Sequence, residues 1–297
     1  TVAPGAKWSP RSGATVYLYA NGSKAGQVIV QVSNLEGAAV TGVVADSLGR
    51  QRTITYRTTT VWFIFTSYSL VDDVRNITAY KTDYSWFGFG GPALPGSVVQ
   101  RGSGGWDTAA VSAFANAEAV FDYYQTVLGL KSFDGKGAAV KVSIGYNPTS
   151  LFAAAYNNAY WDPTIKQFVF GNGANLGAAE DVVGHEYTHA VVSSVLGASA
   201  LGSGESGALN EAFADILGSL IEGKTGSAKW LIGEDSTFPG GAVRNLADPA
   251  SIVTSYGAYR TNYANRYTGS GDDGGEPINS TIFSYAANEE NPLANGL

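Results

Sequence analysis

His185-Glu186-Tyr187-Thr188-His189 contains the only two histidines of this 297-residue chain. In an α-helix, side chains four residues apart lie one above the other, so both imidazoles can reach the same metal ion. The pattern HExxH on a helix is typical of a zinc site, with Glu186 placed to activate a water molecule. An acidic start at residues 180–181 and apolar residues on the remaining faces favour a buried helix. The alternative is a surface helix whose histidines only pack or face solvent.

A second helix is predicted over residues 207–218, with the sequence GALNEAFADILG. Its apolar side is expected to contain Leu209, Ala212, Phe213, Ile216, Leu217 and Leu220. Glu211 and Asp215 share another face of this helix. A catalytic zinc has three protein ligands and one open position, so Glu211 is the predicted third ligand. Asp215 is placed to fix a ligand imidazole through its second nitrogen; otherwise the pair is an ordinary acidic helix face.

The motifs HEYTH and GALNEAFAD together resemble the thermolysin family of zinc endopeptidases. Similar segments lie on both sides in the same order: YNNAYW at 156–161, GGAVRNLADP at 240–249 and DDGGEPINS at 272–280. The resemblance implies an α+β, two-lobed zincin fold, with zinc in the cleft between the lobes. A β-rich N-terminal lobe is expected over residues 38–196 and a mainly helical C-terminal lobe over residues 197–297. Residues 1–37 are either the remnant of a pro-segment or an additional N-terminal strand pair.

The resemblance also implies a substrate-binding site. Asn158 and the carbonyl of Ala159 are expected to hold the peptide backbone beside Trp161, and Arg244 to bind a substrate carbonyl. A pocket for a large apolar side chain is expected from Val182, Ile232 and Val243. Asn210 joins Asp215 as a residue that supports the zinc ligands. The implied reaction is zinc-dependent hydrolysis of peptide bonds on the amino side of large hydrophobic residues, with Glu186 activating the water.

Three departures from the family pattern point to reduced activity. Pro277 stands where the family has a histidine that stabilises the oxyanion, and the chain has no other histidine for this role. The family tyrosine ahead of the third ligand is missing near Gly202, in a loop that is longer by about two residues. The C-terminal lobe is expected to be incomplete, because the sequence ends at Leu297 where the family continues with further helices. The alternative function is therefore a zinc-binding but impaired or zymogen-like family member.

Calcium is the second metal that the resemblance implies. Asp181, Glu222 and Glu234 match carboxylates that share a calcium ion near the zinc helices. Lys229 stands where the family has an aspartate for an adjacent second ion. We expect its ammonium to replace that second ion, which leaves one calcium at this position. The alternative is a solvated acidic surface cluster.

Composition excludes several other classes of protein. The net charge is −7 with no basic run, which argues against binding to nucleic acid or to anionic membranes. A structural zinc site is disfavoured because such sites have four Cys or His ligands, and the chain has no cysteine and two histidines. The expected partners are protein or peptide substrates, the chain's own pro-segment or a separate C-terminal fragment. As in the family, a secreted location is expected.

Periodicity predicts the remaining elements. The N-terminal region is predicted to form β-hairpins, because alternating segments are separated by turn residues. Asp107 is the predicted cap of a long helix that ends near Leu128. The predicted strands are 14–20, 27–33, 39–45, 138–144 and 167–170.

Overall fold

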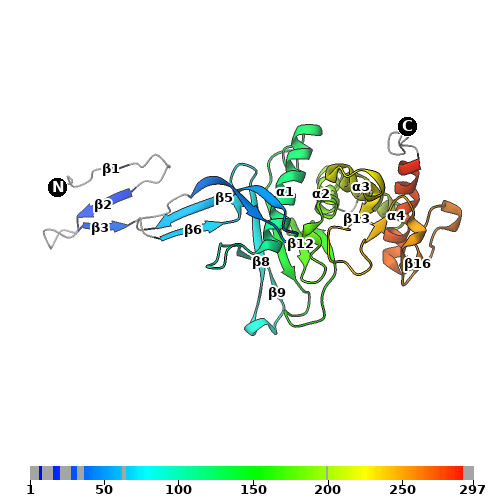
Figure 1. Ribbon diagram of the computed structural model, residues 1–297, viewed down its shortest axis with the longest axis horizontal. Coiled ribbons are helices and arrows are strands. Elements are labelled where there is room, and N and C mark those ends of the chain that lie inside the picture. Colours follow the sequence, from blue (N-terminus) through cyan, green and yellow to red (C-terminus); the bar gives the residue numbers. More distant parts are fainter. Residues whose placement is uncertain are drawn as a thin grey trace.

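The computed structural model describes residues 7–8, 16–20, 28–31, 37–61, 65–198 and 200–289. The molecule is elongated, with the N-terminal strands at one end and the C-terminal helices at the other (Figure 1). The N-terminal strands form an antiparallel sheet of their own, made of β1 (Lys7–Trp8), β2 (Val16–Ala20) and β3 (Val28–Gln31). These strands confirm the predicted hairpins, although positions 14–15, 27 and 32–33 of the prediction lie outside the described residues.

A second antiparallel sheet contains β4 (Ala38–Ala45), β5 (Gln51–Val61) and β6 (Phe65–Ser69). The turn between β4 and β5 is closed by the carboxylate of Asp46, whose Oδ1 accepts hydrogen bonds from the amides of Leu48 and Arg50, each at 2.9 Å. Gly49 allows this turn because its φ of +76° is one that residues with a side chain rarely adopt.

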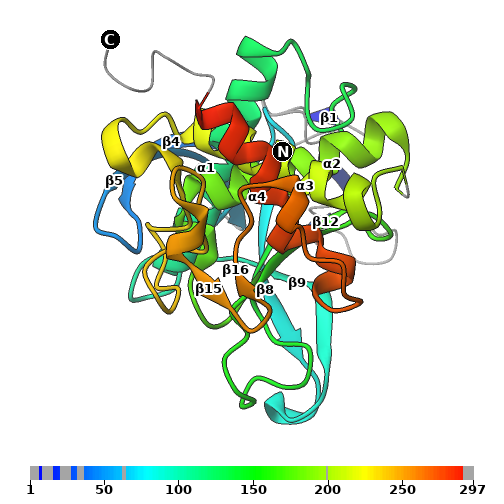
Figure 2. The same ribbon diagram turned by 90° about the vertical axis from the view of Figure 1, so that its right-hand side faces the viewer.

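The central sheet has six strands and supports the candidate site along one edge. Its order is β11-β12-β10-β8-β7, and β9 pairs with β8. β8, β10 and β12 are parallel to one another, whereas β11 runs antiparallel to β12 and forms the edge of the sheet. The bounds are β7 (Val71–Asp72), β8 (Ile77–Tyr84), β9 (Pro92–Val98), β10 (Val140–Tyr146), β11 (Ala159–Asp162) and β12 (Gln167–Gly171). The end of the β8–β9 hairpin, which carries the 3-10 helix η1 (Trp86–Gly88), extends away from the helices (Figure 2).

Helix α1 (Thr108–Val127) packs on this sheet and begins where the sequence predicts. Asp107 is its N-cap and accepts hydrogen bonds from the amides of Ala109 and Ala110. The apolar side of α1 is buried, whereas Leu128, which directly follows the helix, is 46% exposed. The buried residues of that side are Val111, Phe114, Ala117, Val120, Phe121 and Tyr124.

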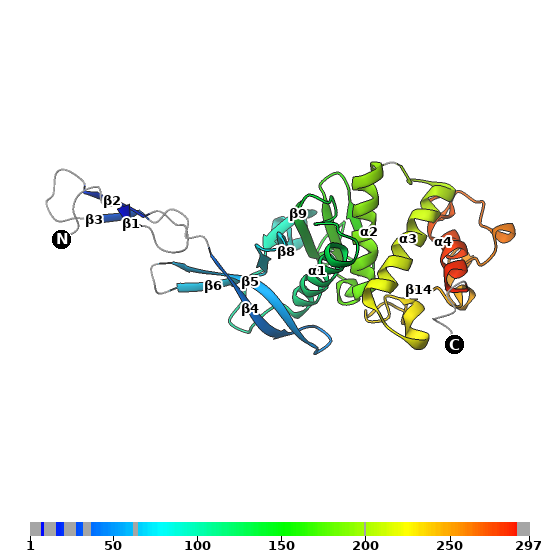
Figure 3. The same cartoon turned by 90° about the horizontal axis from the view of Figure 1, so that it is seen from above.

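Helices α2 (Glu180–Leu196), α3 (Gly204–Glu222) and α4 (Asp272–Glu289) follow α1 along the long axis of the molecule (Figure 3). α2 packs against α3, and α3 packs against α4. α2 and α3 approach closely because they meet at glycines. A Cβ on Gly184 would lie 3.1 Å from the Cα of Gly218, and a Cβ on Gly218 would collide with the carbonyl oxygen of Asp181. This contact sets the spacing between the two helices that carry the predicted metal ligands.

Short elements complete the C-terminal half. They are η2 (Leu176–Ala178), η3 (Gly226–Trp230), β13 (Leu231–Ile232), β14 (Arg244–Asn245), η4 (Pro249–Ser251), β15 (Val253–Thr254), β16 (Gly257–Ala258) and η5 (Tyr263–Asn265). The α+β fold with a sheet-rich N-terminal part and a helical C-terminal part is confirmed. Within the described ranges, no helix is sufficiently long and apolar to span a membrane.

The predicted apolar face of α3 is wrong in part. Phe213 is 46% exposed and Leu220 is 39% exposed, whereas Ala208, Ala212 and Ser219 are buried. α3 lies between α2 and α4, so its buried positions are those at which neighbouring helices come close, and small side chains occupy them.

Candidate active site

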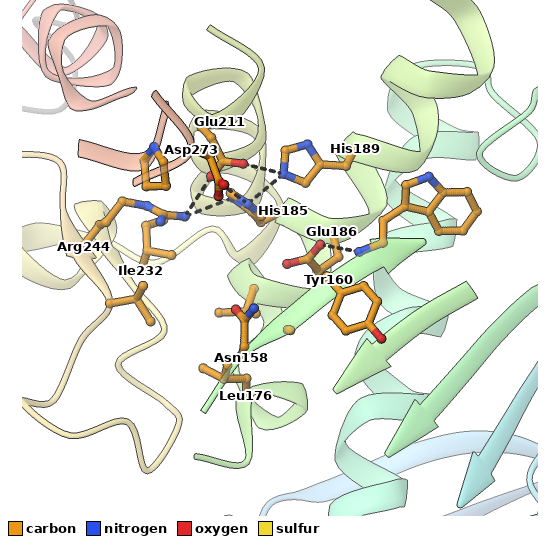
Figure 4. A pocket seen from close by; sticks show the side chains of 15 residues that line it. Asn158, Tyr160, Leu176, His185, Glu186, His189, Glu211, Ile232, Arg244 and Asp273 are labelled. Carbon is orange, nitrogen blue, oxygen red and sulfur yellow. Dashed lines mark hydrogen bonds and ion pairs between the residues drawn. The ribbon is translucent and has the colours of Figure 1, made fainter. Parts of the chain in front are cut away.

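α2 and α3 bring the three predicted zinc ligands together (Figure 4). The Nε2 atoms of His185 and His189 lie 3.0 Å apart, and the two rings are almost perpendicular. The Glu211 carboxylate reaches both imidazoles, with 3.5 Å from Oε2 to His185 Nε2 and 3.1 Å from Oε1 to His189 Nε2. One ligand atom from each residue therefore lies within 4.8 Å of the other two.

Asp215 supports this cluster from behind. Its Oδ1 lies 2.8 Å from Nδ1 of His185, which leaves Nε2 of that ring directed at the other ligands. Arg244 donates from Nε to Oδ2 and from Nη2 to Oδ1 of Asp215, both at 2.7 Å. Burial opposes ionisation of Asp215, but the charge of Arg244 and the hydrogen bond to His185 outweigh it and hold the pKa of Asp215 below its usual value. The carboxylate can therefore orient His185 as the sequence predicts.

His189 is surrounded by hydrogen-bond acceptors. Burial lowers the pKa of this imidazole, but the charge of Glu211 and a hydrogen bond to it prevail and raise the pKa of His189 to about 9. The predicted supporting residue Asn210 lies next to His189 and contributes to this increase in pKa. Asn210 also donates through Nδ2 to the carbonyl of Leu201 at 3.4 Å. Metal binding at this position must displace a proton from His189, so it is favoured by rising pH.

Glu186 faces the same space from the side of the sheet. Its Oε2 accepts a 2.8 Å hydrogen bond from the backbone amide of Trp161 in the edge strand β11. Only 5% of Glu186 is exposed, although the residue lines the cavity described next. The edge strand therefore fixes this carboxylate near the three predicted zinc ligands on the helices. A general base would need to lie in this position.

A cavity of about 380 Å³ lies in front of the cluster. All three zinc ligands, Glu186 and all seven predicted substrate-binding residues border it. Its lining residues are Asn158, Ala159, Tyr160, Trp161, Leu176, Val182, His185, Glu186, His189, Glu211, Ile232, Val243, Arg244, Asp273 and Pro277. Pro277 thus occupies the wall of this cavity. Tyr160, Leu176 and Asp273 also line the cavity, although the sequence did not predict them as site residues.

The edge strand contributes mainly backbone to the cavity. Asn158 is exposed and donates through Nδ2 to the hydroxyl of Tyr156 at 3.2 Å. The indole of Trp161 points into the aromatic core, packs 4.7 Å from the ring centre of Phe168 and donates through Nε1 to Ser193 Oγ. Its backbone amide, which bonds Glu186, is the part of Trp161 that serves the site.

The donor set fits zinc. Two imidazole nitrogens and one carboxylate make a three-ligand site that leaves one position open, as catalytic zinc requires. The ligand atoms border a cavity, and a carboxylate orients His185 by its second nitrogen. An open face beside a carboxylate that could act as a base is the arrangement that metal-assisted hydrolysis needs.

The predicted calcium ligands also converge. Ligand oxygens of Asp181, Glu222 and Glu234 lie within 4.8 Å of one another. Oε2 of Glu222 and Oε2 of Glu234 are buried without a hydrogen-bond partner. Burial and the nearby charge of Glu234 raise the pKa of Glu222 to about 7, and burial together with Glu222 raises that of Asp181. A bound cation would remove this cost of gathering carboxylates, so the site fits calcium.

The lysine beside this cluster is a different one from that predicted. Lys229 lies with its ammonium 4.9 Å from the ring centre of Trp230, outside the cluster. Lys224 enters instead, with Nζ 2.6 Å from Oε1 of Glu234 and 3.2 Å from Oε1 of Glu222. Lys224 follows Gly223, a left-handed helix C-cap that turns the chain back toward the carboxylates. The predicted role of Lys229 is therefore wrong, because the loop after α3 places another residue there.

Comparisons with known proteins agree with this geometry. The thermolysin metallopeptidase catalytic domain matches residues 41–193, and the thermolysin metallopeptidase alpha-helical domain matches residues 201–289. The thermostable neutral protease NprT of Geobacillus stearothermophilus is 37% identical over 264 residues, which cover 84% of this chain and 44% of that protein. Bacillolysin of Brevibacillus brevis is 39% identical over 204 residues, covering 66% of this chain and 35% of that protein.

A solved structure shows a similar fold. It is the precursor of protealysin, a metalloproteinase from Serratia proteamaculans, with a TM-score of 0.57 and 27% sequence identity. The likeness covers 71% of this chain and 66% of the other. The chain spans less than half the length of the curated relatives named above. On the matches to both domains, the chain belongs to the thermolysin family of metallopeptidases.

Proposed function

We propose that this chain is a zinc-dependent endopeptidase that cleaves peptide bonds on the amino side of large hydrophobic residues. The observation that carries the proposal is the convergence of His185, His189 and Glu211 at a cavity that Glu186 also lines, with its carboxylate held by the Trp161 amide. Bound there, zinc would supply a Lewis acid that polarises the scissile carbonyl and makes water more acidic. The family membership supports the same activity.

Glu186 is the proposed general base. The Trp161 amide holds one of its carboxylate oxygens at 2.8 Å, which leaves the other oxygen to accept a proton from the attacking water. The same carboxyl then donates that proton to the leaving amine. Asp215 and Arg244 keep His185 in a single orientation throughout, because both Asp215 oxygens are held by the guanidinium.

The edge strand β11 is the proposed binding surface for an extended peptide. The carbonyl of Asn158 accepts a hydrogen bond from Gly171, and the amide of Trp161 donates to Glu186 on the opposite side. Backbone groups alternate in direction along a strand, so the carbonyl and amide of Ala159 face the cavity with those of Trp161. An extended substrate can pair with these groups as an added strand.

Two further sets of residues would position the substrate. Val182, Ile232 and Val243 border the cavity and offer an apolar wall for a large side chain after the cut. Arg244 lines the cavity as well, and its ion pair with Asp215 fixes the guanidinium for contact with a substrate carbonyl. Such an apolar pocket discriminates by about ten- to two-hundredfold per methylene, which favours broad cleavage of unfolded proteins.

Removal of zinc tests the proposed activity. The chain loaded with zinc and calcium is expected to cleave casein, and 1,10-phenanthroline added in excess calcium should abolish cleavage. Added zinc should then restore it, because the ligands form a site without the metal. Cleavage that persists after zinc has left the protein, as measured by elemental analysis, would contradict the proposal. One bound zinc without any cleavage would also contradict it, and would identify an inactive zinc-binding chain.

We further propose that one calcium ion binds between Asp181, Glu222 and Glu234. The unpartnered carboxylate oxygens and the raised pKa of Glu222 support this site. Lys224 already neutralises part of the acidic cluster through Glu234 and Glu222, so one divalent ion suffices for the remaining charge.

Calcium is therefore expected to stabilise the zinc-loaded chain. At a hundred times its Kd, one calcium ion should add about 2.7 kcal/mol to the free energy of unfolding. That corresponds to a Tm increase of roughly 4 °C for a chain of this size. Thermal unfolding with increasing CaCl₂ measures it, and Glu222→Gln should reduce the increase strongly. A titration that shows two calcium ions at this cluster, or a Tm that calcium leaves unchanged, would refute the account.

We also propose an extracellular location and a pro-segment partner. Both rest on the family resemblance, and the structural likeness to a protealysin precursor supports the second. Residues 1–37 are the candidate pro-segment remnant, with an additional strand pair as the other interpretation. β1–β3 form a sheet separate from the central one, which is compatible with either.

A further inference from the structure

Asp273 lines the catalytic cavity without any role in the chemistry described above. Asp273 borders the cavity on the side of α4, the side on which Arg244 also lies (Figure 4). Its backbone is left-handed, with φ of 51°, at the irregular start of α4. The residue is exposed, and among the described residues its carboxylate has neither a hydrogen bond nor an ion pair. A negative charge with no partner in the protein therefore faces the space that a substrate would enter.

The neighbouring acidic side chains differ, because each has a structural role. Asp272 Oδ2 accepts a 2.8 Å hydrogen bond from the amide of Ile278. Glu205 accepts a hydrogen bond from the hydroxyl of Tyr263 and lies 3.5 Å from Nε of Arg266. Local hydrogen bonds and ion pairs therefore account for the positions of Asp272 and Glu205. Glu276 likewise packs over α3, where a Cβ at Gly207 would collide with its carboxyl group.

Arg244 lines the same cavity and Arg260 lies in the same half of the chain, but each has other contacts. The guanidinium of Arg244 donates two hydrogen bonds to the buried Asp215. The guanidinium of Arg260 lies against Gly257, 3.5 Å from the position of a Cβ there. The positive end of the helix dipole at the start of α4 favours an acidic residue there. It does not require the carboxylate of Asp273 to border the cavity.

We infer that Asp273 is a specificity-determining residue that selects peptides with a positive charge beside the scissile bond. The charge is either a Lys or Arg side chain or a free amino terminus, since both present an ammonium or guanidinium to the carboxylate. The inference rests on the proposed peptidase function. A single solvent-accessible ion pair predicts a preference of about threefold to fivefold. Because the contact is exposed to solvent, the preference should decline at high ionic strength.

The test uses fluorogenic peptides that share one apolar cleavage site. Lys or Gln is placed in turn at each of the three positions on either side of the cut, and a second set compares a free with an acetylated amino terminus. The zinc- and calcium-loaded chain is compared with Asp273→Asn and with Asp248→Asn at low salt. Asp248 is the matched control, because it is also exposed in the C-terminal lobe but does not line the cavity. The readouts are kcat/KM ratios and peptide binding measured by fluorescence anisotropy.

At one or more positions, or at the free amino terminus, the unmodified chain should favour the cationic peptide by about threefold to fivefold. Asp273→Asn should reduce that ratio to nearly one, whereas Asp248→Asn should keep it. A ratio near one throughout, or a preference that survives Asp273→Asn, would overturn the inference. If no peptide is cleaved, the proposed peptidase function fails instead, and the same ratios in the binding measurement still decide the role of Asp273.

Discussion

Glu186→Gln should reduce kcat by about a hundredfold to ten-thousandfold while the chain keeps its zinc, because the substitution removes the general base and leaves the ligands in place. Glutamine has the shape of glutamate, and its amide oxygen can still accept the hydrogen bond from the Trp161 amide. The variant should therefore fold and bind metal as before. Turnover of a neutral fluorogenic peptide, with zinc content measured on the same sample, tests this.

Glu180→Gln is the matched control for that variant. Glu180 begins the same helix and lies 3.9 Å from Arg52, away from the cavity. It should retain nearly full activity, so a loss restricted to Glu186→Gln identifies the base. If Glu186→Gln kept more than a tenth of the original kcat, another group would have to accept the proton and the mechanism would be wrong.

Pro277→His should increase kcat by roughly tenfold to a hundredfold, because it places an imidazole donor in the wall of the cavity. Among the described residues that line the cavity, Arg244 is the single arginine or lysine, and Asp215 engages it. A donor near the developing oxyanion would therefore meet little competition. One such donor typically contributes a hundredfold to a thousandfold, so the expected gain lies at or below the lower end of that range.

Pro277→Ala is the control for Pro277→His. It removes the proline ring without adding an imidazole, so it separates the effects of these two changes on activity. Glu276 separates Pro277 from four residues with left-handed backbone, 272–275, and removal of proline frees this start of α4. The alanine variant should not gain activity. Steady-state kinetics on the three proteins, with KM and kcat resolved, decide the matter. An unchanged kcat in Pro277→His, or an equal gain in Pro277→Ala, would refute the explanation of reduced activity by Pro277.

The zinc ligands and their support could be predicted because they are side chains at fixed helical spacing. HEYTH places His185 and His189 four residues apart, and Glu211 and Asp215 follow the same rule on the second helix. The structure brings all three predicted ligands into reach of one another and puts Asp215 on His185. The capped helix after Asp107 also follows from local pattern.

Other features depend on tertiary contacts that no local pattern contains. The backbone amide of Trp161 holds Glu186, and a backbone group leaves no signal in residue types. Lys224 rather than Lys229 enters the acidic cluster, because the direction of the loop after α3 decides which ammonium reaches it. The exposed position of Phe213 on α3 reflects packing between two helices, which periodicity alone does not distinguish from packing against one.

An anomalous difference map of zinc-loaded crystals, collected on both sides of the zinc absorption edge, shows directly where zinc binds. We expect one peak between Nε2 of His185, Nε2 of His189 and the carboxylate of Glu211, open on the cavity side toward Glu186. A zinc peak elsewhere, or none at this position with the three side chains directed apart, would contradict the proposed zinc site.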